Sequence, residues 1–214
     1  MIIRILLCLT FVCSSMNALW GQQMLVEKGV SEFYIGGAAG IGNGNSATAG
    51  EVGIGIDGIV GLNAGFSSMH DNSVATRVAF VVASIAVHGR NGKLPSLLGM
   101  RAGYLKGEES DAFDFGFGIL VAPRVTRSLI LTLGGSADLL FPITDSRYRY
   151  RSRTSLQTAI GFTAGARLGI SRNVYCFVGP AVAIAQNNTI FSLGAGFGIR
   201  GSTSSRFANK PDGE

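Results

Sequence analysis

Charged residues and long apolar runs are both scarce in this chain. Only 14% of its 214 residues are charged, against about 25% in an ordinary soluble domain. The longest apolar stretch beyond the N-terminus, Val78 to Val87, is interrupted at Ser84, whereas a membrane-spanning helix needs about 20 apolar residues. The chain is nevertheless 47% hydrophobic. Its apolar residues must therefore follow a period other than that of a spanning helix.

Cysteine and proline are rare as well. Cys8 and Cys13 lie in an N-terminal segment typical of a secretory signal, so the mature chain keeps only Cys176 and can form no internal disulfide. No Cys/His spacing indicates a metal site, and the Gly-x-Gly pairs do not open a helix as a phosphate-binding loop would. We therefore expect no metal ion and no cofactor. The 5 prolines against 31 glycines exclude a proline-rich linker.

Residues 1–22 have the organisation of a cleaved signal peptide. Arg4 gives a short basic start, and residues 5–12 form an apolar core of the usual length. Small residues follow, and we expect cleavage after Gly21 or after Ala18. Removing Arg4 leaves 17 Lys and Arg (18 − 1) against 13 Asp and Glu, a net charge of +4. This excess is too small to indicate nucleic-acid binding.

The strongest positive signal is an alternation with a period of two. Along residues 113–121, large apolar side chains occupy the odd positions, and mostly Asp and Gly occupy the even ones. Such alternation indicates β-strands with one apolar face. The parity of the third segment changes after Val82, which suggests a bulge. Nine segments show the pattern: 33–42, 50–68, 73–88, 96–107, 112–125, 128–141, 154–170, 174–186 and 189–200.

The second face of these strands favours a membrane. It consists mainly of Gly, Ala and Ser with isolated charges, whereas the solvent face of a soluble barrel would carry Lys, Glu, Thr and Gln. Small residues suit a crowded interior, and the bulky face is then left to contact lipid. In lipid, closure of the sheet into a barrel satisfies every backbone hydrogen bond. We predict an all-β fold, a closed antiparallel transmembrane up-and-down barrel over residues 31–200 with a polar tail at 201–214. A soluble lipocalin-like barrel or a glycine-rich sandwich is the alternative.

Three motifs resemble the small outer-membrane barrels of the OmpX, OmpW and OmpA-barrel type. They are residues 32–37 (EFYIGG), 113–118 (FDFGFG) and 194–199 (GAGFGI). The resemblance covers residues 31–200 and implies the outer membrane of a diderm bacterium, with outer-membrane lipid as partner. It leaves the oligomeric state open. One departure is the C-terminus, because such barrels commonly end on an aromatic residue whereas this chain continues to Glu214.

The number of strands has two solutions. Outer-membrane barrels usually have an even number, so nine segments give eight strands if one does not span, or ten if segment 50–68 contains a hairpin. The unbroken parity across 50–68 argues against the hairpin, and the sequence therefore favours eight. We expect longer links at 43–50 and 143–154, and short turns at the other end of the barrel.

Eight charged residues have the parity of the inner face. They are Glu51, Asp57, Arg101, Asp114, Arg124, Asp138, Arg167 and Arg200. Because buried charges must be paired, the interpretation we favour is a salt-bridged, structural interior. The alternative is a narrow polar pore in which these residues set the selectivity.

The densest positive charge in the sequence lies in residues 146–153. Its arginines are Arg147, Arg149, Arg151 and Arg153. One hypothesis is that they attract anions, namely small anionic solutes, lipopolysaccharide phosphates or acidic host glycans. The other is a solvated loop flanked by interfacial tyrosines.

Polar residues that are expected to crowd one loop raise catalysis as a further alternative. They are Ser67, Ser68, His70, Asp71 and Ser73. Proximity in sequence is not triad geometry, and turn chemistry explains Ser and Asp at such positions.

The sequence therefore predicts a protein that is not an enzyme and that forms a narrow, porin-like channel for small solutes, as in the OmpW-like group. The alternative function is a surface-exposed structural or adhesin-like barrel with a filled interior, similar to OmpX.

Overall fold

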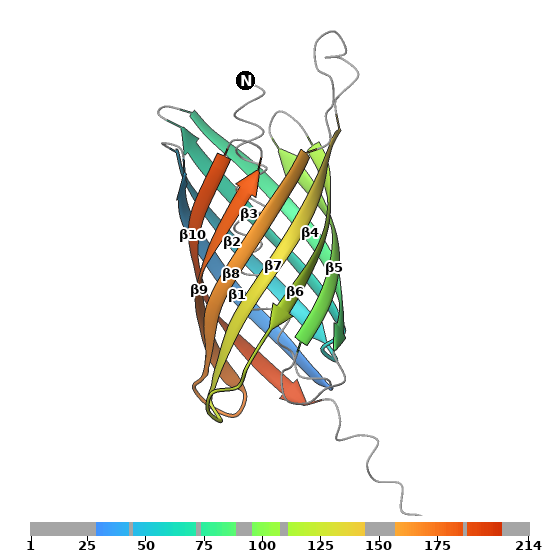
Figure 1. The fold of residues 1–214 in the computed structure, drawn as a ribbon, viewed down its shortest axis with the longest axis vertical. Helices are drawn as coiled ribbons and strands as arrows, with labels where there is room; N and C mark the ends of the chain where they lie inside the picture. The colour runs from blue at the N-terminus through green and yellow to red at the C-terminus, as the bar shows by residue number, and fades with distance from the viewer. Residues whose placement is uncertain are drawn as a thin grey trace, which may run out of the picture.

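A computed structural model shows that the chain forms a closed barrel of ten antiparallel strands (Figure 1). The structure describes residues 29–42, 45–71, 74–88, 96–107, 111–143, 157–185 and 188–202. Within these residues no helix has the length and apolarity needed to cross a bilayer. The predicted signal peptide and most of the predicted tail lie outside the described residues.

Each strand pairs with its neighbour in sequence, and β1 pairs with β10 to close the barrel. Closure leaves no edge strand, so the backbone can satisfy its hydrogen bonds within lipid. The strands are β1 (Val30–Gly42), β2 (Asn45–Ile56), β3 (Val60–Asp71), β4 (Val74–His88), β5 (Ser96–Gly107), β6 (Asp111–Val121), β7 (Leu129–Ile143), β8 (Gln157–Gly169), β9 (Val174–Ala185) and β10 (Asn188–Ser202).

Segment 50–68 contains the hairpin of β2 and β3, so the barrel has ten strands rather than the favoured eight. Asp57 and Gly58 both have a positive φ, 53° and 66°, and the amide of Ile59 donates to the carbonyl of Ile56 at 3.0 Å. Asp-Gly with these φ values is a common hairpin turn. Ile59 adds a third loop residue, so Ile56 pairs with Val60. Paired residues therefore share the same parity, and the alternation continues through the turn.

Strand β4 contains no bulge, contrary to the sequence prediction. Its register is continuous with both β3 and β5. Val78, Phe80 and Val82 are buried on the inner face, whereas Val81 and Ile85 are exposed on the outer face. The strand is thus apolar on both faces near its middle. The apparent change of parity came from this two-sided apolarity and not from a shift in register.

The two ends of the barrel differ less than expected. We call the end where β1 begins and β10 ends the terminal end, which lies at the bottom of Figure 1, and the opposite end the distal end. Four of the five distal links have only two or three residues, and only the link at 144–156 is long. The long link expected at 43–50 is wrong, because β2 already begins at Asn45.

The width of the barrel depends on the number of strands and on the shear, which is measured by following paired residues once around the barrel. From Glu32 the path runs through Gly55, Gly61, Ser84, Arg101, Gly116, Asp138, Ala159 and Ala185 to Asn188. On β1, Ile41 lies nine residues from Glu32 toward the distal end, and its partner on β10 is Phe191. Asn188 lies three residues farther toward the distal end than Phe191. One full circuit of paired residues therefore shifts the register by 12 residues, and this shift is the shear of the barrel. With ten strands this gives a tilt of about 40° and a radius of about 10 Å.

Candidate functional site: the lumen of the barrel

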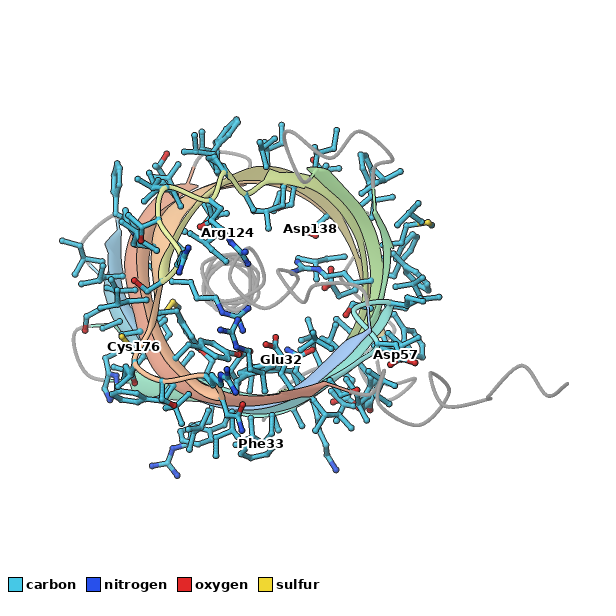
Figure 2. All side chains as sticks on the ribbon, turned by 90° about the horizontal axis from the view of Figure 1, so that it is seen from below. Glu32, Phe33, Asp57, Arg124, Asp138 and Cys176 are labelled. Atoms are coloured by element: carbon cyan, nitrogen blue, oxygen red, sulfur yellow. The ribbon has the colours of Figure 1, made fainter. Side chains whose placement is uncertain are left out.

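The alternation separates an apolar outer wall from the lumen. Figure 2 shows Phe33 outside the ring of strands and Glu32 inside it. The outer wall exposes large side chains such as Phe115 and Phe117, whereas the alternate positions Asp114 and Gly116 are buried on the inner face. An outer surface of this kind requires lipid rather than water.

Inward-facing aromatic rings lie flat against the wall of the lumen. Each of them is paired directly with a glycine on the neighbouring strand, and a Cβ atom built on that glycine would collide with the ring. The rings therefore occupy space that the glycines leave at the wall, and do not extend across the lumen. The pairs are Tyr34 with Gly53, Phe80 with Gly65, Tyr175 with Gly198 and Phe177 with Gly196.

The first charged cluster, which we call the Arg101 network, joins three adjacent strands. Arg101 on β5 has its Nε 3.2 Å from Oδ2 of Asp114 on β6 and its Nη2 2.7 Å from Oδ1 of Asp138 on β7. All three side chains are buried. Gly116 lies opposite both Arg101 and Asp138, and a Cβ atom there would collide with both side chains. Glycine at this position therefore leaves the space that the two ion pairs occupy.

The second cluster, the Arg167 network, joins strands that are distant in sequence. Arg167 on β8 places Nη2 2.6 Å from Oε2 of Glu32 on β1. The hydroxyl of Tyr175 on β9 donates to the same Oε2 at 2.9 Å. The Arg167 guanidinium carbon lies 3.4 Å from the Tyr175 ring centroid, and the ring in turn covers Gly198 on β10. The network therefore connects both sides of the β1–β10 closure.

A third buried polar contact lies between β2 and β3. Nδ2 of Asn63 donates to Oε2 of Glu51 at 3.2 Å, and both residues are buried. Together with the Arg101 and Arg167 networks, it places four carboxylates and two guanidinium groups among the buried residues of the wall.

The structure separates the eight predicted lumen charges into two groups. Five are buried on the inner face: Glu51, Arg101, Asp114, Asp138 and Arg167. Arg124 is exposed beyond the end of β6, with its side chain inside the ring of strands in Figure 2. Arg200 is partly exposed, and its Nε donates to the carbonyl of Arg172 at 3.0 Å.

Asp57 differs from the prediction, because it lies in the exposed β2–β3 turn and not on the wall. Its backbone adopts the left-handed conformation that the turn needs, which Asp tolerates better than most residues. The arginines of the basic loop, Arg147, Arg149, Arg151 and Arg153, lie outside the described residues.

Glu32, the carboxylate of the Arg167 network, was not among the residues predicted for the lumen. The strand was expected to begin at residue 33, whereas β1 begins at Val30. Extending the alternation upstream by one residue would have placed Glu32 on the inner face with Tyr34. Tyr175 was also missed, because an aromatic side chain on the inner face has no distinct sequence signal of its own.

The polar residues considered for catalysis do not form a loop. Ser67, Ser68, His70 and Asp71 belong to β3. Ser67 is buried on the inner face, whereas His70 is exposed, so the alternation places these two side chains on opposite faces of the sheet. Ser73 lies outside the described residues. Across the described part of the chain, no group of three or more His, Cys, Asp or Glu residues could hold a metal ion.

Apolar side chains form a belt inside the distal end of the lumen. They belong to one packed cluster that also contains alanines of β2 and β8. We call the belt the apolar ring and define it by one residue from each of six strands: Met69, Val78, Leu105, Ala112, Leu140 and Ile190. The ring departs from the small and polar character of most of the inner face.

The closed ladder, the apolar outer wall and the polar lumen define a transmembrane β-barrel of the outer-membrane type. No family model and no curated protein matches the chain. Among solved structures, an outer-membrane channel from Pseudomonas putida F1 is similar, with 9% identity and a TM-score of 0.56 over 82% of this chain and 97% of that one. The chain therefore has the fold of an outer-membrane β-barrel.

Two further solved structures resemble the chain less closely. The translocator domain of the autotransporter NalP from Neisseria meningitidis is 10% identical, with a TM-score of 0.46 over 85% of this chain and 94% of that one. A loop deletion mutant of OmpT, an outer-membrane protein of Vibrio cholerae, is 9% identical, with a TM-score of 0.39 over 77% of this chain. The match spans 62% of the length of the OmpT mutant.

Proposed function

We propose that the barrel is a non-enzymatic channel through which small solutes cross the outer membrane of a diderm bacterium. In this proposal the N-terminal signal peptide directs export of the protein and is then cleaved. The pairing of inward aromatic rings with glycines is the observation that carries this proposal. Because Tyr34, Phe80, Tyr175 and Phe177 lie against the wall, these four bulky side chains do not extend across the barrel. A backbone radius of about 10 Å then leaves room for a narrow passage.

The charged groups near the terminal end support a preference for anions. Arg124, Arg127 and Arg172 are exposed in the β6–β7 and β8–β9 connections, and Arg200 is partly exposed beside them. These two connections are adjacent, since the amide of Gly169 donates to the carbonyl of Ser128 at 2.7 Å. Positive charge at a pore mouth raises the local concentration of anions. The basic loop at 146–153 would act in the same way, and could alternatively bind lipopolysaccharide phosphates or acidic glycans.

The second candidate function is a structural or adhesin-like surface barrel. The Arg101 and Arg167 networks favour it, because buried ion pairs brace an interior without conducting anything. The two functions differ in one measurable property, since a filled interior conducts few ions.

The test begins with the purified protein from outer-membrane extracts. A band whose gel mobility in SDS changes on boiling would establish the closed barrel. Single-channel recording in planar bilayers then separates the functions: discrete ion-conducting steps support the channel, and their absence from a heat-modifiable protein supports the filled barrel. The reversal potential in a salt gradient measures anion preference, and replacing Arg124, Arg127 and Arg172 by Gln should lower it.

A further inference from the structure

The apolar ring occupies a single level of the lumen. Each of its six members lies within the five strand residues nearest the distal end, for example Leu105 in a strand that ends at Gly107 and Ala112 in one that begins at Asp111. The strands concerned are β3 to β7 and β10, which are distributed around most of the barrel. A solute that crosses the lumen must therefore pass these apolar side chains.

The ring lies directly next to charged residues. On β6 and β7, Ala112 and Leu140 are each two residues from Asp114 and Asp138 of the Arg101 network, on the same inner face. The lumen thus changes from a charged level to an apolar one within about 7 Å along the strand. Lipid contact does not explain the ring, because its side chains are buried inside the barrel while the outer wall carries its own apolar residues.

We propose that the apolar ring is the selectivity filter of this channel, favouring small solutes with an apolar side over hydrated ions and fully polar solutes. The proposal rests on the channel function proposed above. An apolar lining binds water weakly and so opposes the entry of hydrated ions. A solute with an apolar side loses less, because part of its surface is removed from water at the ring.

Valine and threonine form a matched pair of probes for the filter. Both are zwitterions of nearly the same shape, and they differ in a methyl group against a hydroxyl. Osmotic swelling of liposomes that contain the purified barrel measures the entry of each amino acid. We expect the wild-type protein to admit valine about fourfold faster than threonine, which is the ratio for burial of one methyl group.

Leu105→Ser and Leu140→Ser, made separately, introduce a hydroxyl at the ring. Each should bring the ratio of valine to threonine entry close to one and raise single-channel ion conductance at least about twofold. Leu120→Ser is the matched control, since Leu120 is also buried on the inner face but lies near the terminal end, one residue before β6 ends. It should leave the ratio unchanged. Boiled and unboiled gel mobility selects the variants that fold, and Leu105→Met provides a conservative substitution that should retain the ratio.

Three results would overturn the filter. They are a wild-type ratio close to one, an unchanged ratio in folded Leu105→Ser and Leu140→Ser proteins, and an equal change in Leu120→Ser. In each of these cases solutes still enter, so the channel function survives. If neither the wild type nor any variant admits solutes or conducts ions, the channel function itself fails and the filter fails with it.

Discussion

The Arg101 and Arg167 networks solve the same problem, a charge buried in a barrel wall, in different ways. The Arg101 network is local: one guanidinium serves two carboxylates on the two following strands. The Arg167 network is distant: its guanidinium and the Glu32 carboxylate are 135 residues apart, and Tyr175 supplies both a hydroxyl donor and a ring face. The first has more acid than base, and the second shares a single carboxylate between two donors.

This difference indicates different structural roles. The Arg101 network braces β5, β6 and β7, which are already hydrogen-bonded in sequence order. The Arg167 network connects β8 and β9 to β1 across β10, and so reinforces the closure between the first and last strands. We expect loss of the first to be severe because two buried carboxylates would lose the guanidinium that they share, and loss of the second to be milder.

Replacing Arg101 by Ala should have the largest effect. Asp114 and Asp138 would lose their shared guanidinium in a buried site, which costs about 3–5 kcal/mol of unfolding free energy. Urea-induced unfolding from lipid vesicles measures this loss. Adding Asp114→Asn and Asp138→Asn to the same protein should recover most of it, because no charge then remains in the cluster. Wild-type stability of Arg101→Ala alone would show that the network contributes nothing.

Replacing Arg167 by Ala should cost less, about 2 kcal/mol, because Glu32 keeps the hydroxyl of Tyr175 as a donor. The same urea titration tests this, and Tyr175→Phe, which retains the ring, should cost about 1 kcal/mol. Single-channel conductance is also measured on the Arg167→Ala protein. Unchanged conductance with lower stability would make Arg167 structural and remove it from the pore, and a loss larger than that of Arg101→Ala would reverse the comparison.

Alanine at the glycine of each network perturbs it without removing a charge. At Gly116 the added Cβ would collide with Asp138 and Arg101, and at Gly198 it would collide with the Tyr175 ring. Each substitution should cost about 1–3 kcal/mol, as overpacking generally does, with Gly116→Ala the more costly because it separates a buried ion pair. Gly201→Ala is the control, since nothing lies within 4 Å of its Cβ position. An equal loss at Gly201 would show that the effect is not one of space.

The smallest effect is expected at Asp57, which belongs to neither network. Asn also tolerates a positive φ, so Asp57→Asn should change the unfolding free energy by less than about 0.5 kcal/mol and leave the conductance unaltered. Asp57→Val should be clearly less stable, because a β-branched residue is strained at φ 53°. A change in ion selectivity in Asp57→Asn would return this carboxylate to the lumen charges.

The strands could be predicted from sequence because their signal is local. Residues 96–107 were predicted as a strand and form β5 with the same ends. This prediction needs only the alternation of apolar and small or polar residues along one segment. The number of strands was harder, although Asp57-Gly58 is a strong turn signal. The unbroken alternation across residues 50–68 nevertheless favoured eight strands, because the parity of apolar residues does not change across a turn with an odd number of residues.

The pairing of distant residues could not be predicted in the same way. Arg167 contacts Glu32 only because β1 pairs with β10 with a shear of 12 residues. The shear is a property of the whole closed barrel and cannot be predicted from any single segment of the sequence. The composition of the inner face was equally hidden for β4, where Val78, Phe80 and Val82 are buried inside the barrel. Hydrophobicity alone assigned such residues to the lipid.

The three-residue turn between β2 and β3 separates the facing of a side chain from its position number. Ile56 and Val60 are directly paired, so their side chains point to the same side of the sheet. Asp71 and Val74 are paired in the same way with only two residues between them. Loss of one residue from the β2–β3 turn should therefore leave Asn63 on the inner face, as long as Ile56 still pairs with Val60. Natural variation in the length of this turn should accordingly include steps of a single residue.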